Sequence, residues 1–163
     1  DWFHSTRVLN PDTELWWVGP SGWLTPRGLS FRAPRHVRFF GNIPDRELCE
    51  LYHRAAFTIY PSLYEGFGFP VLDSLHHGVP VVCAFNSSLQ EFAGPGVFFF
   101  DACDPNSLDA ACLDLLACLP CPVSYHALAT RFSWDRLACI VLDLTGNGEP
   151  SGEQTGLALM AGN

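Results

Sequence analysis

The chain has 163 residues, which is enough for one domain with a hydrophobic core of its own. Hydrophobic residues make up 48% of it and charged residues only 16%, so its composition excludes an intrinsically disordered chain. A net charge of −8, with arginine as the only basic residue besides histidine, argues against a nucleic-acid partner.

The first half of the chain predicts two strands and a helix. Apolar runs predict the strands at residues 14–18 and 36–40, and each of them ends at a glycine. Between them, residues 23–34 are rich in Gly, Pro, Arg and Ser and are predicted to form a loop. Residues 44–55 are predicted to form a helix, because apolar side chains fall on one face and charged ones on the other. That apolar face consists of Leu48, Leu51, Tyr52 and Ala55.

Residues 57–83 predict a strand, a glycine-containing loop, a short helix and a second strand. The first strand, residues 57–60, stops at Pro61. Pro70 suits the first turn of a helix over residues 70–77, since its missing N–H would have no partner there, and Gly78 ends that helix. Residues 80–83 begin the next strand.

The loop at residues 65–69 predicts an anion site beside hydroxyl-binding carboxylates. A helix N-terminus presents unpaired N–H groups and a partial positive charge, which together suit a phosphate. Gly66 and Gly68 lack a Cβ, so a ligand can approach their backbone closely. Glu65 and Asp73 would repel phosphate, so they are predicted to accept hydrogen bonds from sugar hydroxyls. A ligand with both kinds of group is a nucleotide or a nucleotide sugar.

The remaining part of the chain predicts further crossover units. Ser88 is predicted to cap a short helix through Glu91. Residues 96–100 form another strand, and Asp104 caps a helix to about residue 119, with Leu108, Ala111, Cys112 and Leu115 on its apolar face. A last helix starts near Ser124 and includes residues 131–135, and residues 146–163 form a flexible tail. This order predicts an α/β fold, a Rossmann-like parallel sheet with helices on both faces.

The seven cysteines and the lengths of the apolar runs are used to predict metal binding and the cellular compartment. Cys118 and Cys121 have the C-x-x-C spacing of redox and zinc sites, but no second pair of ligands stands at a suitable spacing, so no metal is predicted. The odd number of cysteines and the lack of a targeting pattern favour a reducing cytoplasm. No apolar run has membrane-spanning length, while association with a membrane surface stays open.

Glu65 and Asp73, separated by seven residues that include Gly66-Phe67-Gly68, resemble the E-x7-E motif of retaining glycosyltransferases with the GT-B fold. PSLYEGFG before the helix and GVPVV after it are most similar to family 4, the group 1 glycosyltransferases. The similarity covers most of residues 12–145, including the segments PDTELWWVGPSGW, VRFFGNIPDRELCELYHRA, NSSLQE and FSW. It implies that residues 1–145 are the donor-binding domain, the C-terminal half of a GT-B fold, incomplete at its N-terminus.

The resemblance also assigns roles by position. Glu65 would be the catalytic residue beside the donor sugar, and Asp73 would hold the ribose. The backbone of Gly66, Phe67, Gly68 and Phe69 would bind sugar and phosphates, with Ser87 and Ser88 also near the donor, although helix capping is an equal alternative for these serines. Asp73 departs from the glutamate of the family and is one methylene shorter. The family also places an arginine and a lysine against the diphosphate, and this sequence has no lysine.

The expected function is transfer of a sugar from a nucleotide-sugar substrate to a hydroxyl of a carbohydrate or lipid-linked acceptor, without a cofactor. A separate N-terminal domain would hold the acceptor. One alternative is a non-catalytic nucleotide-sugar binding module, or a decayed remnant, that needs a partner domain. Another is a GT-B relative with epimerase or phosphorylase chemistry, against which the wording PSLYEGFG argues.

Overall fold

The computed structural model describes residues 2–20, 36–118 and 130–145. They belong to two units, Asp1–Ala129 and Thr130–Asn163, each of which is described by itself. The predicted loop at residues 23–34, Cys121 of the C-x-x-C pair and the predicted tail at residues 146–163 lie outside the described residues.

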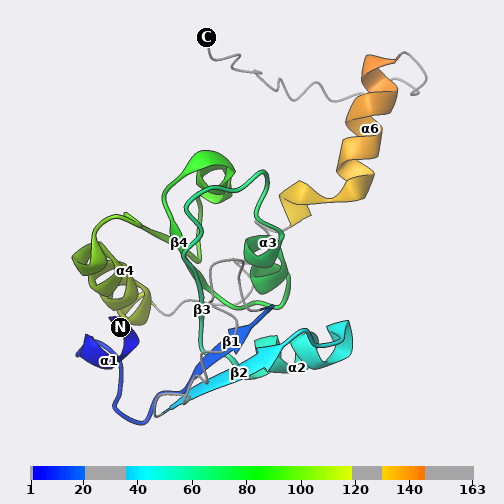
Figure 1. The fold of residues 1–163 in the computed structure, drawn as a ribbon. Coiled ribbons are helices and arrows are strands. Elements are labelled where there is room, and N and C mark those ends of the chain that lie inside the picture. The colour runs from blue at the N-terminus through cyan, green and yellow to red at the C-terminus, as the bar shows by residue number, and fades with distance from the viewer. Residues whose placement is uncertain (1, 21–35, 119–129, 146–163) are drawn as a thin grey trace. The chain divides into compact units, whose positions relative to one another are not determined.

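The first unit alternates strands and helices, as the sequence predicts (Figure 1). The predicted strands and the two longer predicted helices are confirmed to within about two residues at each end. In chain order the elements are α1 (Trp2–Ser5), β1 (Leu15–Val18), β2 (Val37–Gly41), α2 (Asp45–Arg54), β3 (Thr58–Tyr60), α3 (Phe69–His76), β4 (Val81–Ala84), η1 (Ser87–Phe92), β5 (Val97–Phe100) and α4 (Pro105–Ala117).

All the strand pairs are parallel, but they form two sheets. β1 pairs with β2, and β4 lies between β3 and β5 in a three-stranded sheet. The expected single sheet is therefore interrupted: among the described strands, no ladder joins the pair of β1 and β2 to the sheet of β3, β4 and β5. α2 connects β2 to β3 across this interruption.

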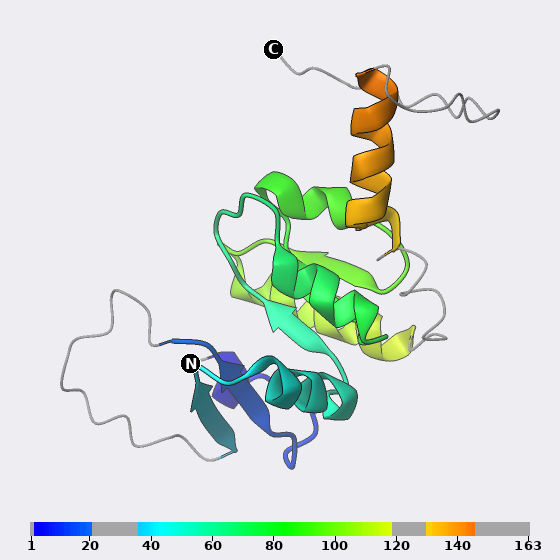
Figure 2. The same cartoon turned by 90° about the vertical axis from the view of Figure 1, so that its right-hand side faces the viewer.

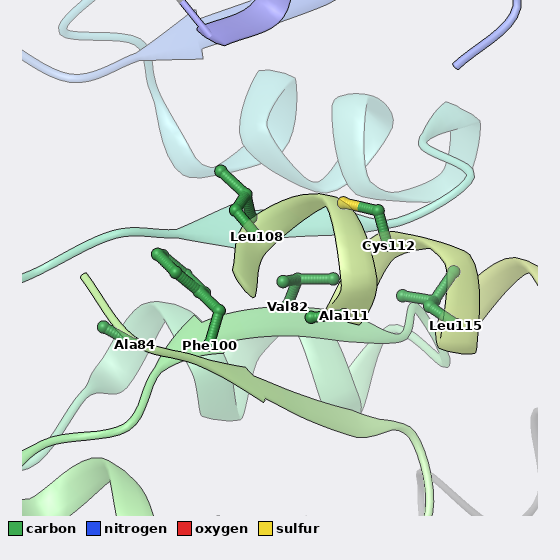
Figure 3. Packing of buried hydrophobic residues seen from close by; sticks show 7 residues of the cluster. All are labelled: Val82, Ala84, Phe100, Leu108, Ala111, Cys112 and Leu115. Carbon is green, nitrogen blue, oxygen red and sulfur yellow. The ribbon is translucent and has the colours of Figure 1, made fainter. Parts of the chain in front are cut away.

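The core lies on both faces of the three-stranded sheet. On one face, Val82 and Ala84 of β4 and Phe100 of β5 pack against α4 (Figure 3). Val81 and Cys83 point to the opposite face, because side chains alternate along a strand, and α3 covers this side (Figures 1 and 2). The residues of α4 in the cluster are those predicted from the sequence: Leu108, Ala111, Cys112 and Leu115. Helices therefore cover both faces, as predicted.

The N-terminal segment forms a short helix, α1, that the sequence does not predict. Trp2 Nε1 donates a hydrogen bond of 2.8 Å to Asp109 Oδ1 of α4, and Thr6 Oγ1 donates one of 2.5 Å to the same oxygen. Trp2 and Val8 also pack against the core cluster. The segment is thus ordered by α4, more than a hundred residues away, and local patterning carries no signal of that contact.

The second unit corrects the prediction for residues 131–135. A single helix through these residues was expected, whereas a 3-10 turn, η2 (Thr130–Phe132), precedes α6 (Trp134–Leu144). Ser133 separates them: its backbone is extended and its Oγ accepts a hydrogen bond of 3.2 Å from Arg136 N. Ser133 is therefore the N-cap of α6. Because an N-cap residue has a non-helical backbone, the 3-10 turn and α6 do not form one continuous helix.

Candidate functional site

The loop between β3 and α3 is held by three consecutive residues after β4. Asn86, Ser87 and Ser88 form this group, which we call the latch. Asn86 Nδ2 donates to the carbonyl oxygen of Ser62. Ser87 Oγ accepts a hydrogen bond of 3.0 Å from Glu65 N, and Ser88 Oγ donates one of 3.0 Å to Glu65 O. The latch therefore fixes the main chain of Glu65 on both sides of its Cα.

The contacts of the latch contradict the expected capping role of Ser88. Ser88 does not cap the following helix: η1 is a 3-10 helix with Asn86 as N-cap and no side-chain cap, so the capping alternative is wrong. Both hydroxyl protons are used within the protein, since Ser87 Oγ also donates to Asn86 Oδ1 at 3.0 Å. The two serines act on the loop through its backbone.

The side chain of Glu65 is held by a tyrosine that the sequence analysis did not single out. Tyr60 OH, at the end of β3, donates a hydrogen bond of 2.5 Å to Glu65 Oε1. Burial raises the pKa of the Tyr60 phenol, and the hydrogen bond to Glu65 and its negative charge raise it further. The phenol is therefore protonated at neutral pH and serves as a donor. In the sequence, the only indication of this contact is that Tyr60, a residue with a hydroxyl group, stands directly before the loop.

The two glycines of the loop differ in their surroundings. Gly68 has φ of +99°, and a Cβ there would overlap Leu89 Cδ2 and lie 3.3 Å from Phe92 Cε2. Glycine at 68 is thus required by backbone conformation and by packing against η1. A Cβ at Gly66 would meet no heavy atom within 4 Å, so open space surrounds this position. The open space at Gly66 leaves room for a ligand near its backbone, whereas at Gly68 conformation and packing alone account for the glycine.

The loop and the start of α3 present backbone donors. Val71 N and Leu72 N bond to Gly68 O, which closes the first turn. Among the described residues, the N–H groups of Gly66, Gly68 and Phe69 donate no hydrogen bond to the protein. Such a cluster of N–H groups at a helix start suits an anion. The ring of Phe67 packs on Phe92 with centroids 5.5 Å apart, so its side chain serves η1 packing.

Asp73 lies on α3, and its carboxylate has no hydrogen bond or ion pair among the described residues. Burial raises the pKa of the Tyr52 phenol to about 12, and the negative charge of Asp73 contributes to that rise. Tyr52 in turn acts electrostatically on Tyr60. A hydrogen bond joins Tyr60 to Glu65, whereas Asp73 acts on Tyr52 through its charge alone. No contact joins the two carboxylates directly.

Tyr52 also ties α2 to α3. It is buried, its OH donates a long hydrogen bond of 3.4 Å to Pro70 O, and its ring stacks on His77 at 4.8 Å. His76 and His77 lie at the end of α3, as predicted, and His77 Nδ1 bonds to Asp73 O at 2.8 Å. These contacts position the helix that carries Asp73.

Three described arginines of the first unit have their contacts outside the loop. Arg38 pairs with Glu14, Arg46 with Glu50, and Arg54 lies 5.0 Å from the ring of Trp16. Within the described parts of the chain, no group of three or more His, Cys, Asp and Glu residues is placed to hold a metal. No helix among the described residues is both long and apolar enough to cross a bilayer.

Comparison with known proteins identifies the family. The family model "Glycosyl transferases group 1" matches residues 21–124, which is more than half of the chain. The chain belongs to the group 1 glycosyltransferases. The resemblance inferred from PSLYEGFG and the flanking segments is thus confirmed.

Individual group 1 relatives are longer than this chain. The O-antigen chain mannosyltransferase B of Escherichia coli is 38% identical over 107 residues, which cover 61% of this chain and 27% of that protein. The glycogen synthase of Mycobacterium tuberculosis is 34% identical over 88 residues, covering 52% and 21%. The matched regions therefore span about a quarter or less of these relatives.

A solved structure supports the fold. The sucrose-phosphate synthase from Thermosynechococcus elongatus matches with a TM-score of 0.61 at 24% identity, over 82% of this chain and 38% of that one. At this identity the similarity is evidence of architecture alone. It agrees with the Rossmann-like arrangement of the first unit, as expected for a group 1 glycosyltransferase with the GT-B fold.

Proposed function

We propose that this chain binds the nucleotide-sugar donor of a retaining glycosyltransferase. The observation that carries the proposal is the family match over a region containing the loop, where Glu65 is immobilised beside free backbone donors. The sugar goes to a hydroxyl of a carbohydrate or lipid-linked acceptor. That acceptor is held by a domain other than the one described here. The names of the mannosyltransferase and glycogen synthase relatives favour a carbohydrate acceptor.

The proposed roles follow the chemistry of each group. Glu65 and Asp73 complete the E-x7-E motif: Glu65 accepts a hydroxyl of the donor sugar, and Asp73, whose carboxylate has no hydrogen bond or ion pair among the described residues, accepts the ribose hydroxyls. The backbone from Gly66 to Phe69 binds the diphosphate and stabilises it as it leaves. Ser87 and Ser88 keep Glu65 in place, which leaves only their acceptor lone pairs for the donor.

Calorimetric titration tests the donor site. The 163-residue chain is titrated with UDP, GDP, UDP-glucose and GDP-mannose, in parallel with Glu65→Ala and Asp73→Ala. Each substitution is expected to weaken one nucleotide sugar about tenfold or more, the loss of a hydrogen bond to a charged group. Asp73→Glu, which restores the residue of the family, is expected to strengthen binding. Glu91→Ala, at an exposed position of η1, is the matched control and should bind as the wild type does.

The outcomes separate two functions. Absence of binding by the folded chain would refute the donor site. Binding, followed by sugar release to an acceptor when a second domain is supplied, would support the transferase. Binding that never leads to transfer would favour a non-catalytic nucleotide-sugar module. The absence of lysine and the aspartate at position 73 are the observations that keep this second candidate in view.

A further inference from the structure

Glu65 is the most constrained residue of the loop. Its N–H is bonded to Ser87, its carbonyl oxygen to Ser88 and its Oε1 to Tyr60. Two of these contacts act on the backbone and one on the side chain. Among the described residues Oε2 receives no hydrogen bond, so it remains available to a ligand.

In this contact the Tyr60 phenol is the hydrogen-bond donor and the Glu65 carboxylate is the acceptor. A phenol carries one proton, and a carboxylate can only accept. The proton of Tyr60 therefore occupies one side of Glu65 Oε1, over 2.5 Å. The remaining lone pairs of the carboxylate are acceptors for hydroxyl groups. Tyr60 itself is anchored, because it pairs with Cys83 in the parallel ladder between β3 and β4.

From these contacts we propose that Tyr60 is a positioning residue, which fixes the rotation of the Glu65 carboxylate so that Oε2 faces the donor sugar. The proposal rests on the proposed function and extends it to the recognition of the sugar. Since the latch holds the backbone of Glu65, loss of the Tyr60 hydroxyl frees only the side-chain torsions of Glu65. The effect of that loss should therefore fall on the sugar end of the donor and spare the nucleotide end.

The test compares a nucleotide sugar with its own nucleotide. GDP-mannose and GDP, and UDP-glucose and UDP, are titrated into the wild-type chain and into Tyr60→Phe. Tyr60→Phe is expected to weaken the nucleotide sugar about three- to tenfold, the entropy of re-immobilising one side chain, and to leave the nucleotide unchanged. A structural defect of the domain would instead weaken both ligands together.

Two further variants sharpen the comparison. Tyr64→Phe is the matched control, because Tyr64 is 81% exposed and its hydroxyl makes no hydrogen bond in the described structure; it should bind as the wild type does. In Glu65→Ala the acceptor of the Tyr60 hydroxyl is gone, so adding Tyr60→Phe should cause no further loss of the nucleotide sugar. If Tyr60→Phe weakened binding of the nucleotide sugar by the same factor with and without Glu65, the proposal would be overturned.

A ligand-free measurement tests the contact itself. With 13C-labelled tyrosine Cζ, the Tyr60 resonance is assigned by its disappearance in Tyr60→Phe. Glu65→Gln should shift this resonance at constant pH and leave that of Tyr64 in place. If no tyrosine Cζ resonance moved in Glu65→Gln, the contact would be refuted even if Tyr60→Phe did not fold. If the wild-type chain shows the contact but binds no nucleotide sugar, the proposed function fails and the role of Tyr60 fails with it. If it binds and Tyr60→Phe loses nothing, only the role of Tyr60 fails.

Discussion

Gly68 and Gly66 stand two positions apart and are expected to respond oppositely to the same substitution. Gly68→Ala places a Cβ at a left-handed φ of +99° and against Leu89, so it should lower the free energy of unfolding by about 2–4 kcal/mol. Gly66→Ala meets open space and should leave stability unchanged while it weakens binding of a nucleotide sugar. Urea unfolding and calorimetry measure the two effects. A stable Gly68→Ala variant would contradict the packing explanation.

Because the thiols of Cys83 and Cys112 are buried, the protein is expected to lose stability at alkaline pH. Burial raises the pKa of Cys83 to about 12, and burial with the charge of Asp109 raises that of Cys112 to about 11, from an ordinary 9.0. Above about pH 9 the unfolded chain loses these protons and the folded chain keeps them. The free energy of unfolding should therefore be independent of these groups below pH 9 and fall as pH rises beyond it.

Urea unfolding between about pH 7 and pH 10.5 measures this fall. Cys83→Ala is expected to reduce its slope, because one of the two protonation differences disappears. Cys103→Ala is the control: Cys103 is exposed and should leave the slope as it is in the wild type. Identical slopes in all three proteins would show that Cys83 is not a source of the fall.

At the scale of elements, Ser74 joins α3 to both neighbouring segments. It is fully buried, its Oγ donates to Val79 O at 2.9 Å, and it lies 2.8 Å from Thr58 Oγ1 of β3. Because its one proton goes to Val79, the threonine is the donor in the second bond. Ser74→Ala leaves a buried carbonyl and a hydroxyl without these partners and should destabilise by about 1–3 kcal/mol. Thermal or urea unfolding checks this, with exposed Ser5→Ala as a control that should unfold like the wild type.

Sequence periodicity was sufficient for most elements because each one is specified locally. The apolar face of α4, the cap at Asp104 and the glycine after α3 are all signals within a few residues. For the site, the sequence predicted a glycine loop with two carboxylates and placed Ser87 and Ser88 near it, but not which atoms these serines contact. The contacts that fix Glu65 join it to residues 22 and 23 positions away, and α1 docks on Asp109 across 107 positions. Such pairings depend on the tertiary fold, and a pattern of neighbours does not encode them.

At the scale of the whole molecule, the two-stranded sheet leaves aromatic surface in water. Trp17 and Phe39 oppose each other in the ladder, with ring centroids 5.8 Å apart, and are 56% and 48% exposed. Adjacent exposed aromatics favour association on a sheet whose edges have no ladder partner among the described strands. The chain is expected to self-associate as its concentration rises, and Trp17→Thr, which keeps strand propensity, should reduce this.

Light scattering after size-exclusion chromatography, over a concentration series, measures the association. Trp134→Thr in the second unit is the matched control, because Trp134 is 76% exposed and carries the same change. A monomeric wild-type chain at all concentrations would contradict the prediction. An equal effect of both substitutions would show that exposed tryptophan in general is responsible, and not the sheet.

The latch has a consequence for the order in which the chain folds. Its contacts with Ser62 and Glu65 span 22 to 24 residues, and the β3–α3–β4 crossover fills the interval. Loop closure of that length becomes favourable only when the parallel pairing of β3 with β4 already holds the two ends together. The carboxylate of Glu65 should thus reach its final position late, and substitutions in the latch should speed unfolding more than they slow folding.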